Sequence, residues 1–242
     1  MGLFDLPAPL YNAIQQLLDG LPPLLQLSIW AVLTGIVSMA CYWFFSNQGK
    51  VAGAKEAALA ARKALNAYEG HEFSEMWALV GATLRTSGKH FWIVLGPALL
   101  GSLPALTLIV WVSNQFGYQM PQAGDTLNIT IETEAGDTGS LDFVYPAADA
   151  TLPVTAADGE ELTTLPLQAA IPVIHKKLWW NTLIANQAGY LDDSSTVAAI
   201  RPDLTPQHFI SIGPDWARHW ELTYFLLLII SSLAIKFAFR ID

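Results

Sequence analysis

Three long apolar stretches dominate the pattern of hydrophobic and polar positions along this chain. Residues 91–111 contain no ionisable side chain, and at about 1.5 Å per helical residue they match the bilayer core, which is about 30 Å thick. Residues 24–45 are also uncharged. Residues 222–239 are apolar apart from Lys236, which lies near enough to the end for its ammonium group to reach the lipid headgroups. The pattern therefore predicts three transmembrane helices.

The central stretch contains Pro97 and Pro104, which would argue against a helix in water. In a membrane bundle, neighbouring groups can satisfy the carbonyls that proline leaves without a donor, and Gly96 and Gly101 let another helix approach closely. We therefore expect a kinked central helix. Tryptophans near the ends of the spans are expected to anchor them at the headgroups: Trp30, Trp43, Trp92, Trp111, Trp216 and Trp220.

Between the first two spans the apolar period becomes that of a coiled coil. A heptad frame over residues 50–68 places six residues along one seam: Val51, Ala54, Ala58, Ala61, Leu65 and Tyr68. Five apolar residues then recur at intervals of three and four, and predict a second helix that ends near Ser87: Phe73, Met76, Trp77, Val80 and Leu84. Because a short loop makes two helices antiparallel, the segment predicts a helical hairpin that projects from the membrane.

The first 23 residues predict a short amphipathic helix. Leucines and an isoleucine recur at helical spacing opposite a polar face, and Gly20 with Pro22 ends the pattern. The apolar face consists of Leu10, Ile14, Leu17, Leu18 and Leu21. Two positions remain open for this helix: on the outer lipid interface, or packed against the external domain.

Residues 114–213 change to the period of a β-strand. Residues 127–133, 140–145 and 152–156 alternate between apolar and polar, and turn signals at 135–139 and 158–159 separate them. Further extended candidates are residues 162–167, 171–174, 197–200 and 209–212. Short strands joined by turns predict a small antiparallel β-sandwich. Trp179 and Trp180 belong either to its core or to its contact with the bilayer.

The distribution of charge orients these parts. The segment between the first two spans holds six basic residues: Lys50, Lys55, Arg62, Lys63, Arg85 and Lys89. Residues 118–216 carry three basic side chains against thirteen acidic ones, so most of the net charge of −9 belongs to this segment. The positive-inside rule then places the hairpin and the C-terminus in the cytoplasm, and the N-terminus and residues 114–213 outside. We expect an integral protein of the bacterial inner membrane.

The expected organisation has six parts. Residues 1–23 form the interfacial helix, 24–46 the first transmembrane helix, 47–90 the cytoplasmic hairpin, 91–113 the second transmembrane helix, 114–213 the extracytoplasmic all-β domain, and 214–240 an interfacial start with the third transmembrane helix. The fold class is thus an α-helical membrane protein with a helical hairpin and a sandwich-like β-domain.

No pattern in the chain indicates catalysis, a cofactor or a metal. The five histidines are scattered without the spacing of metal ligands, and phosphate-binding loops, dinucleotide turns and nucleophile elbows are absent. No span carries an acidic residue or arginine at mid-depth, which removes the usual marker of proton relays. The acidic balance also disfavours nucleic acid. We expect a protein that is not an enzyme and whose partners are lipid and other membrane proteins.

The order of these parts resembles the three-span branch of the YidC/Oxa/Alb insertase superfamily, which includes the third subunit of the ER membrane protein complex and archaeal relatives. The resemblance rests on residues 76–97, continuing to Ser102-Leu103-Pro104, in a chain with a basic hairpin and an N-out first span. It implies a groove between the spans, open to the cytoplasm and to lipid, and a coiled coil that receives client helices. Seven residues are the candidate lining: Gln26, Thr34, Ser38, Ser102, Thr107, Ser231 and Ser232.

Two functions remain open. The first is insertase-like assistance to membrane-protein insertion or assembly, in which a wet groove lowers the cost of moving polar groups through lipid. The second is a non-catalytic scaffold subunit of a larger membrane complex, such as an energy-transducing or photosynthetic one, whose acidic external face docks a basic soluble protein. The first span offers only Thr34 and Ser38 where bacterial insertases usually place a basic residue, and residues 114–213 separate spans that the family joins briefly.

Overall fold

The computed structural model describes residues 2–145, 151–155, 161–166 and 169–241, and the side chains outside residues 146–168. The chain divides into two compact units. The first unit comprises Met1–Trp30 and Thr107–Phe225, and the second comprises Ala31–Leu106 and Leu226–Asp242. Each long apolar helix passes from one unit into the other.

Three helices are long and apolar enough to cross a membrane: α2 (Pro23–Phe45), α4 (Phe73–Phe116) and α6 (Trp220–Ala238). They contain the three apolar stretches that the sequence singles out, so the prediction of three such helices is confirmed. The short helices α1 (Ala8–Leu18) and α5 (Asp215–Arg218) precede α2 and α6, and a 3₁₀ turn, η1 (Leu3–Asp5), precedes α1.

α4 is one continuous helix of 44 residues, whereas the sequence pattern predicted that a separate helix would end near Ser87. At about 1.5 Å per residue it is about 66 Å long, roughly twice the thickness of a bilayer core. Its continuity has a simple cause, because a glycine such as Gly88 costs a helix only about 1 kcal/mol. In addition, the hydroxyls of Thr83 and Thr86 donate to the carbonyls one turn earlier, at 2.9 and 2.8 Å, and so do not cap a new helix.

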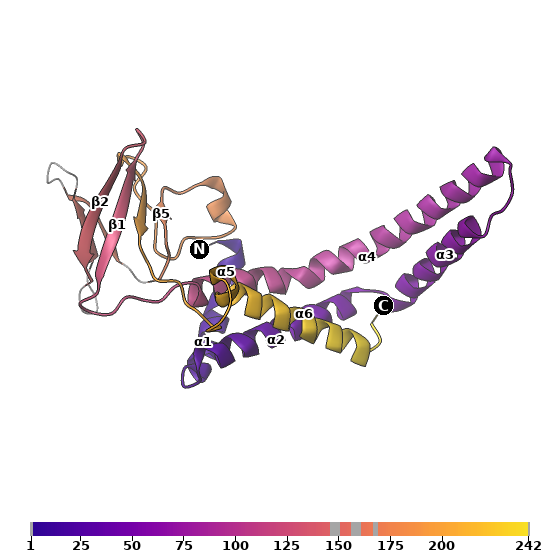
Figure 1. Ribbon diagram of the computed structural model, residues 1–242, viewed down its shortest axis with the longest axis horizontal. Helices are drawn as coiled ribbons and strands as arrows, with labels where there is room; N and C mark the ends of the chain where they lie inside the picture. The colour runs from indigo at the N-terminus through magenta and orange to yellow at the C-terminus, as the bar shows by residue number, and fades with distance from the viewer. Residues whose placement is uncertain (1, 146–150, 156–160, 167–168, 242) are drawn as a thin grey trace. The chain divides into compact units, whose positions relative to one another are not determined.

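α3 (Gln48–Asn66) runs antiparallel to the first part of α4, and the two form a hairpin (Figure 1). Asn47 caps α3, since its side-chain oxygen accepts a hydrogen bond from the backbone N–H of Lys50 at 3.0 Å. At the tip, the Tyr68 hydroxyl lies 3.1 Å from the carbonyl of Glu72 and 3.0 Å from the carboxylate of Glu75. These contacts tie the connecting turn to the start of α4.

The first unit contains a small antiparallel sheet in the strand order β2-β1-β6-β5. Its strands are β1 (Thr126–Thr133), β2 (Thr138–Val144), β5 (Ile174–His175) and β6 (Val197–Pro202), and β3 (Thr151–Thr155) pairs with β4 (Glu161–Pro166) in a separate two-stranded sheet. Gly136, with φ of +87°, allows the tight turn between β1 and β2. The turn predicted at residues 158–159 lies outside the described residues.

The expected β-sandwich is wrong: this sheet is small, and the described residues place no second sheet over its core. Five strand residues form a buried cluster with four residues from irregular segments. The strand residues are Leu127 and Ile129 of β1, Ile174 of β5, and Val197 and Ile200 of β6, and the others are Ile171, Ala188, Leu191 and Leu204. Proline explains why the predicted strand at residues 171–174 is shortened, because Pro172 has no N–H to donate to a neighbouring strand. Of the candidate strand at 171–174 only Ile174 pairs, and residues 209–212 form a loop between Pro206 and Pro214.

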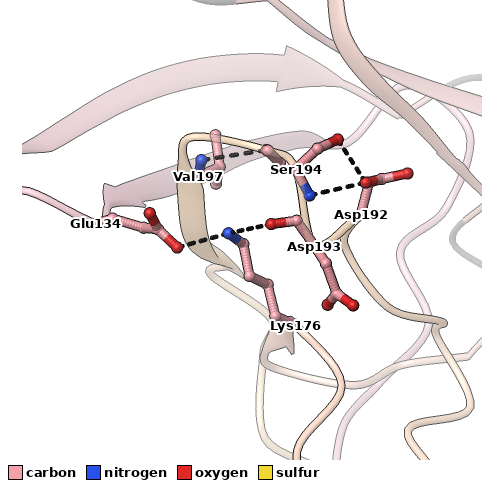
Figure 2. A network of polar contacts seen from close by, with 7 residues as sticks. Glu134, Lys176, Asp192, Asp193, Ser194 and Val197 are labelled. Carbon is pink, nitrogen blue, oxygen red and sulfur yellow. Dashed lines mark hydrogen bonds and ion pairs between the residues drawn. The ribbon is translucent and has the colours of Figure 1, made fainter.

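A network of polar contacts joins the loop before β6 to the sheet (Figure 2). The Lys176 ammonium donates to the Glu134 carboxylate at 2.5 Å and to the backbone oxygen of Asp193 at 3.0 Å. The Asp192 carboxylate accepts from the hydroxyl and the backbone N–H of Ser194, at 2.6 and 2.8 Å. These two bonds, and more weakly the charge of Lys176, lower the pKa of Asp192 below its ordinary value.

Candidate functional site

In the second unit, α2 packs directly against α6 and α4 at positions that have no side chain. A Cβ added to Gly35 would collide with the Ser231 hydroxyl and lie 3.1 Å from that of Ser232. A Cβ added to Gly101 would lie 3.2 Å from the backbone oxygen of Ser38. Glycine and serine therefore allow these helix backbones to approach closely, as is typical of helix contacts in membranes.

Five of the seven predicted groove residues belong to this unit, and four of them lie at these contacts. Thr34 is fully buried beside Gly35, and the buried hydroxyl of Ser38 has no hydrogen-bond partner among the residues that the structure describes. The hydroxyls of Ser231 and Ser102 donate to carbonyls of their own helices, at 3.0 and 2.8 Å. The structure thus brings Thr34, Ser38, Ser231 and Ser232 into the packing of three helices.

Two cavities of the second unit lie elsewhere. One, of about 490 Å³, lies between α3 and α4 and is lined by small and apolar residues with two lysines: Lys50, Gly53, Ala54, Ala57, Thr86, Lys89 and Ile93. The other, of about 420 Å³, is lined by apolar residues of α2, α6 and the segment after it: Ile36, Met39, Ala40, Trp43, Ile235, Phe239 and Ile241. Neither cavity contains a predicted groove residue.

The hairpin leaves a row of large apolar side chains uncovered. Phe73, Trp77 and Leu84 are 68%, 55% and 69% exposed, and their spacing of four and seven places them on one face of α4. The rings of Phe73 and Trp77 contact each other edge to face, with centroids 5.7 Å apart. We call these three residues the α4 stripe. The sequence identified them as apolar and helical, but could not show that they face away from α3.

The side of α3 that is turned toward α4 is the one that the heptad frame singled out. Each of the six seam residues is buried or half-buried: Val51, Ala54, Ala58, Ala61, Leu65 and Tyr68. Lys55, Glu56, Arg62 and Lys63 are exposed. On α4, Thr83 and Thr86 are half-buried and lie on a different face from the stripe, whereas the half-buried Val80 shares the helical spacing of the stripe and lies at its edge. The hairpin is therefore closed along small residues and open along aromatic ones.

In the first unit, α1 turns its polar face inward. Gln15 is buried, and its side chain donates to Gln26 at 2.6 Å and accepts from the indole of Trp30 at 2.8 Å. Tyr11 and Asn12 contact the far end of α4, through the hydroxyl of Thr107 at 2.8 Å and the indole of Trp111 at 2.7 Å. The predicted groove residues Gln26 and Thr107 are thus bound by α1.

The apolar face of α1 is turned outward, with Leu10 62% and Leu17 83% exposed. A helix with its polar side inside and its leucines outside is stable next to lipid rather than water. The residues just before α1 contact residues 183–185, since the N–H of Phe4 donates to the carbonyl of Leu183 at 2.9 Å and the Asp5 carboxylate accepts from the N–H of Ala185 at 2.8 Å. Both positions predicted for this helix therefore stay open. Trp179 is 80% exposed, which removes it from the sheet's core.

The six tryptophans predicted as anchors fall into two sets. Trp43, Trp92 and Trp216 are exposed, as an anchor at the headgroups requires. Trp30, Trp111 and Trp220 are buried. The rings of Trp30 and Trp111 lie 4.6 Å apart and both contact Tyr11. Their indole N–H groups donate to α1, so within this structure these two rings hold the first unit together.

A cavity of about 740 Å³ adjoins this aromatic cluster. Eight amide side chains contribute to its lining: Asn12, Gln15, Gln16, Asn114, Gln115, Gln119, Gln187 and Gln207. Trp111, Tyr118 and Asp19 also line it. The lining is therefore made mostly of neutral hydrogen-bond donors and acceptors, together with the Asp19 carboxylate.

Three residues that the sequence left apart meet in the first unit. His208, Asp215 and His219 each offer a ligand atom, and these atoms lie within 4.8 Å of one another. His208 is separated from the other two by a segment that the sequence pattern predicted to be a strand. The spacing of Asp215 and His219, four residues apart at a helix start, is the signal that could have drawn attention to them.

No model of a known protein family matches the chain, and no curated protein and no solved structure matches it either. The resemblance to the insertase superfamily therefore stays a prediction, based on the order of the parts and on residues 76–104. Function has to be argued from the surfaces described above.

Proposed function

We propose that this protein is an integral membrane protein that binds apolar helices of other membrane proteins while they insert or assemble. The observation that carries the proposal is the α4 stripe. α4 is too long for a bilayer core, so if residues 91–111 cross it, Phe73, Trp77 and Leu84 project into water. Large side chains aligned on one face of a water-exposed helix mark a surface that a partner covers.

The chemistry of the stripe suits an amphipathic or apolar helix as partner. Aromatic and leucine side chains at helical spacing are the anchors by which helices recognise each other. Burying each such side chain is worth about 1.5–3 kcal/mol, so the three together supply on the order of 5 kcal/mol. That is enough for transient capture, and weak enough for later release.

A cavity between α3 and α4, on the side of α4 opposite the stripe, lies at the base of the hairpin and offers a separate contact. Its lining combines a small, apolar floor with the ammonium groups of Lys50 and Lys89. Under the expected topology these lysines lie near the cytoplasmic headgroups, and they complement acidic residues that flank a client helix. The apolar cavity lined by Trp43 and Phe239 offers a second contact within the lipid.

The direct test is photo-crosslinking from the stripe in intact cells. A photoreactive phenylalanine analogue at Trp77 is expected to crosslink nascent membrane proteins of several kinds. The same analogue at Arg85, an exposed position next to Leu84 but off the stripe, serves as the matched control. Equal yields from both positions, or no client from Trp77, would remove the proposal.

A second candidate function, a scaffold subunit of a larger membrane complex, is favoured by one observation. The predicted groove residues Thr34, Ser38, Ser231 and Ser232 lie in helix contacts, which supports a role in packing rather than a polar path for clients. A scaffold would give one crosslinked partner from Trp77, and would keep that partner at fixed stoichiometry through purification in mild detergent. Many partners, each dependent on ongoing synthesis, would instead favour the insertase-like function.

A further inference from the structure

We propose that His208, Asp215 and His219 form a binding site for one divalent transition-metal ion of the zinc class. The Nε2 atom of His208 lies 3.2 Å from one carboxylate oxygen of Asp215, and Nε2 of His219 lies 3.5 Å from the other. Two ligand atoms about 2.0–2.1 Å from the same tetrahedral Zn²⁺ are about 3.3 Å apart. The two histidine–carboxylate separations are therefore those of ligands that share an ion, and all three ligand atoms lie within 4.8 Å of one another.

The local fold explains why these three residues meet. The backbone N–H of Phe209 donates to the carbonyl of Arg218 at 2.7 Å, which places His208 beside His219. Gly213, with φ of +107°, reverses the chain between them. Two further hydrogen bonds fix the loop. Arg218 Nε donates to the carbonyl of Ile210 at 3.3 Å, and the N–H of Gln207 donates to the carbonyl of Gly117, the residue after α4. The three side chains are thus held close to one another by the fold of the loop.

The environment of the His219 ring also supports a metal site. Its Nε2 atom is buried and, apart from the Asp215 carboxylate oxygen 3.5 Å away, makes no hydrogen bond with the residues that the structure describes. A buried ring nitrogen without a hydrogen bond costs free energy that a metal–nitrogen bond recovers. The Asp215 side chain is 72% exposed, so water can complete the coordination shell.

The donor set selects the class of ion. Two imidazoles and one carboxylate suit Zn²⁺, Co²⁺ and Ni²⁺, whereas Ca²⁺ and Mg²⁺ prefer oxygen ligands throughout. The two rings are stacked, with centroids 5.4 Å apart and planes 7° from parallel. Binding therefore requires one ring to turn so that both nitrogen lone pairs converge, and rotation about the terminal torsion of histidine is broad and inexpensive. The ion would fasten the loop to the residue that precedes α6.

The test uses the full-length protein in detergent, purified without a polyhistidine tag. Titration with ZnCl₂ is expected to give one site per chain, and CoCl₂ to give the intense visible absorption of tetrahedral cobalt. Alanine at any one of the three ligands should weaken Zn²⁺ binding by about tenfold or more, because replacing a residue that only hydrogen-bonds to a metal ligand already costs that much. The variants are His208→Ala, Asp215→Ala and His219→Ala. His71→Ala, at an exposed histidine in the hairpin turn, is the control and should bind as wild type does.

Two outcomes overturn the site: Zn²⁺ affinity that is unchanged in His208→Ala, or affinity that falls equally in His71→Ala, which would show adventitious surface binding only. Because an alanine variant that misfolds would also lose the ion, His208→Cys provides an independent readout. Its Co²⁺ complex should show a thiolate-to-cobalt charge-transfer band, because a thiolate at this position becomes a ligand. A cobalt spectrum without that band contradicts the proposal.

Discussion

The two ends of α2 contact their neighbours through different chemistry. In the first unit, Gln26 and Trp30 are hydrogen-bonded to Gln15 of α1, at 2.6 and 2.8 Å. In the second unit, Gly35 and Ser38 contact α6 and α4 through small side chains and backbone. Hydrogen bonds fix one arrangement of their partners, whereas packing by small residues favours close approach without selecting a direction.

The comparison suggests which part of the molecule is rigid and which can adapt. The hydrogen bonds of Gln15 to Gln26 and Trp30 join buried groups, and losing them is costly. The second unit has no such penalty at Gly35, where α2 would exchange a protein surface for an equally apolar lipid tail. A protein that receives foreign helices requires this second kind of contact, and the proposed function places client binding in that unit.

The largest expected effect is in the first unit, for Gln15→Leu. The substitution removes the acceptor of the Trp30 indole N–H and the donor to the Gln26 side-chain oxygen, and each lost buried hydrogen bond costs about 1–3 kcal/mol. We expect the free energy of unfolding in detergent to fall by about 3 kcal/mol, measured by thermal or denaturant unfolding. Gln16→Leu, at the exposed neighbouring position, should change it by less than about 0.5 kcal/mol. Equal losses in both variants would mean that α1 is held by its apolar face instead.

A smaller effect is expected for Gly35→Ala in the second unit. The added Cβ meets the Ser231 hydroxyl, which can rotate, but it also lies 3.2 Å from the backbone oxygen of Leu228. We expect a loss of about 1–2 kcal/mol, as for other overpacked sites. Gly96→Ala has no atom within 4 Å of its new Cβ, and should be neutral or stabilising by up to about 1 kcal/mol. If both variants changed the free energy of unfolding in the same direction, α2 and α6 would not be in contact at Gly35.

The environment of the outward face of α1 can be measured with spin labels, and no change in stability is expected. A nitroxide at the exposed Leu17, in a protein whose Cys41 is replaced by serine, should be relaxed strongly by oxygen and weakly by a water-soluble nickel chelate, as expected for a side chain at a lipid interface. A label at Gln16, which is exposed on a polar face, should show the opposite ratio. Preference of both labels for the nickel reagent would place α1 in water.

A feature of the fold could be derived from the sequence where it depends on residues near one another in the chain, and not where it depends on contacts between distant residues. The three apolar helices and the α3 seam follow from local periodicity, which needs no tertiary contact. The absence of a sandwich could not be foreseen from alternation, because the layer that covers Leu127 and Ile129 consists of irregular segments with no period. α4 continues through Ser87 because a single glycine costs a helix little. Ser87 and Gly88 were therefore only weak evidence that a helix ends there.

The candidate sites show the same limit more sharply. That Phe73 and Trp77 are apolar is visible in the sequence, but their exposure depends on which face of α4 meets α3. His208 and His219 meet because backbone bonds such as that from Phe209 to Arg218 bring the two sides of a loop together. No residue pattern announces such a bond, so a metal cluster formed by loop closure escapes a search for ligand spacing.

The smallest expected effect concerns Asp192, in the polar network of the first unit. The hydroxyl of Ser194 is the main cause of its lowered pKa, so Ser194→Ala should raise that pKa toward the ordinary value of about 3.9. The backbone N–H of Ser194 and the charge of Lys176 remain, so the pKa should stay below that value. NMR titration of a protein labelled at aspartate would measure the change.

The sign of the accompanying pH dependence follows from the direction of the shift. A carboxylate with a lowered pKa in the folded state contributes stability above its unfolded pKa, and that contribution is lost as the pH falls through the folded value. The melting temperatures of wild type and Ser194→Ala should therefore differ most near neutral pH and converge in strong acid. Asp193→Asn is the matched control, because Asp193 accepts the Lys176 bond through its backbone oxygen. A difference that instead grows in acid would show that Ser194 acts through packing and not through the charge of Asp192, and the polar network would then stabilise the first unit in the way that small residues stabilise the second.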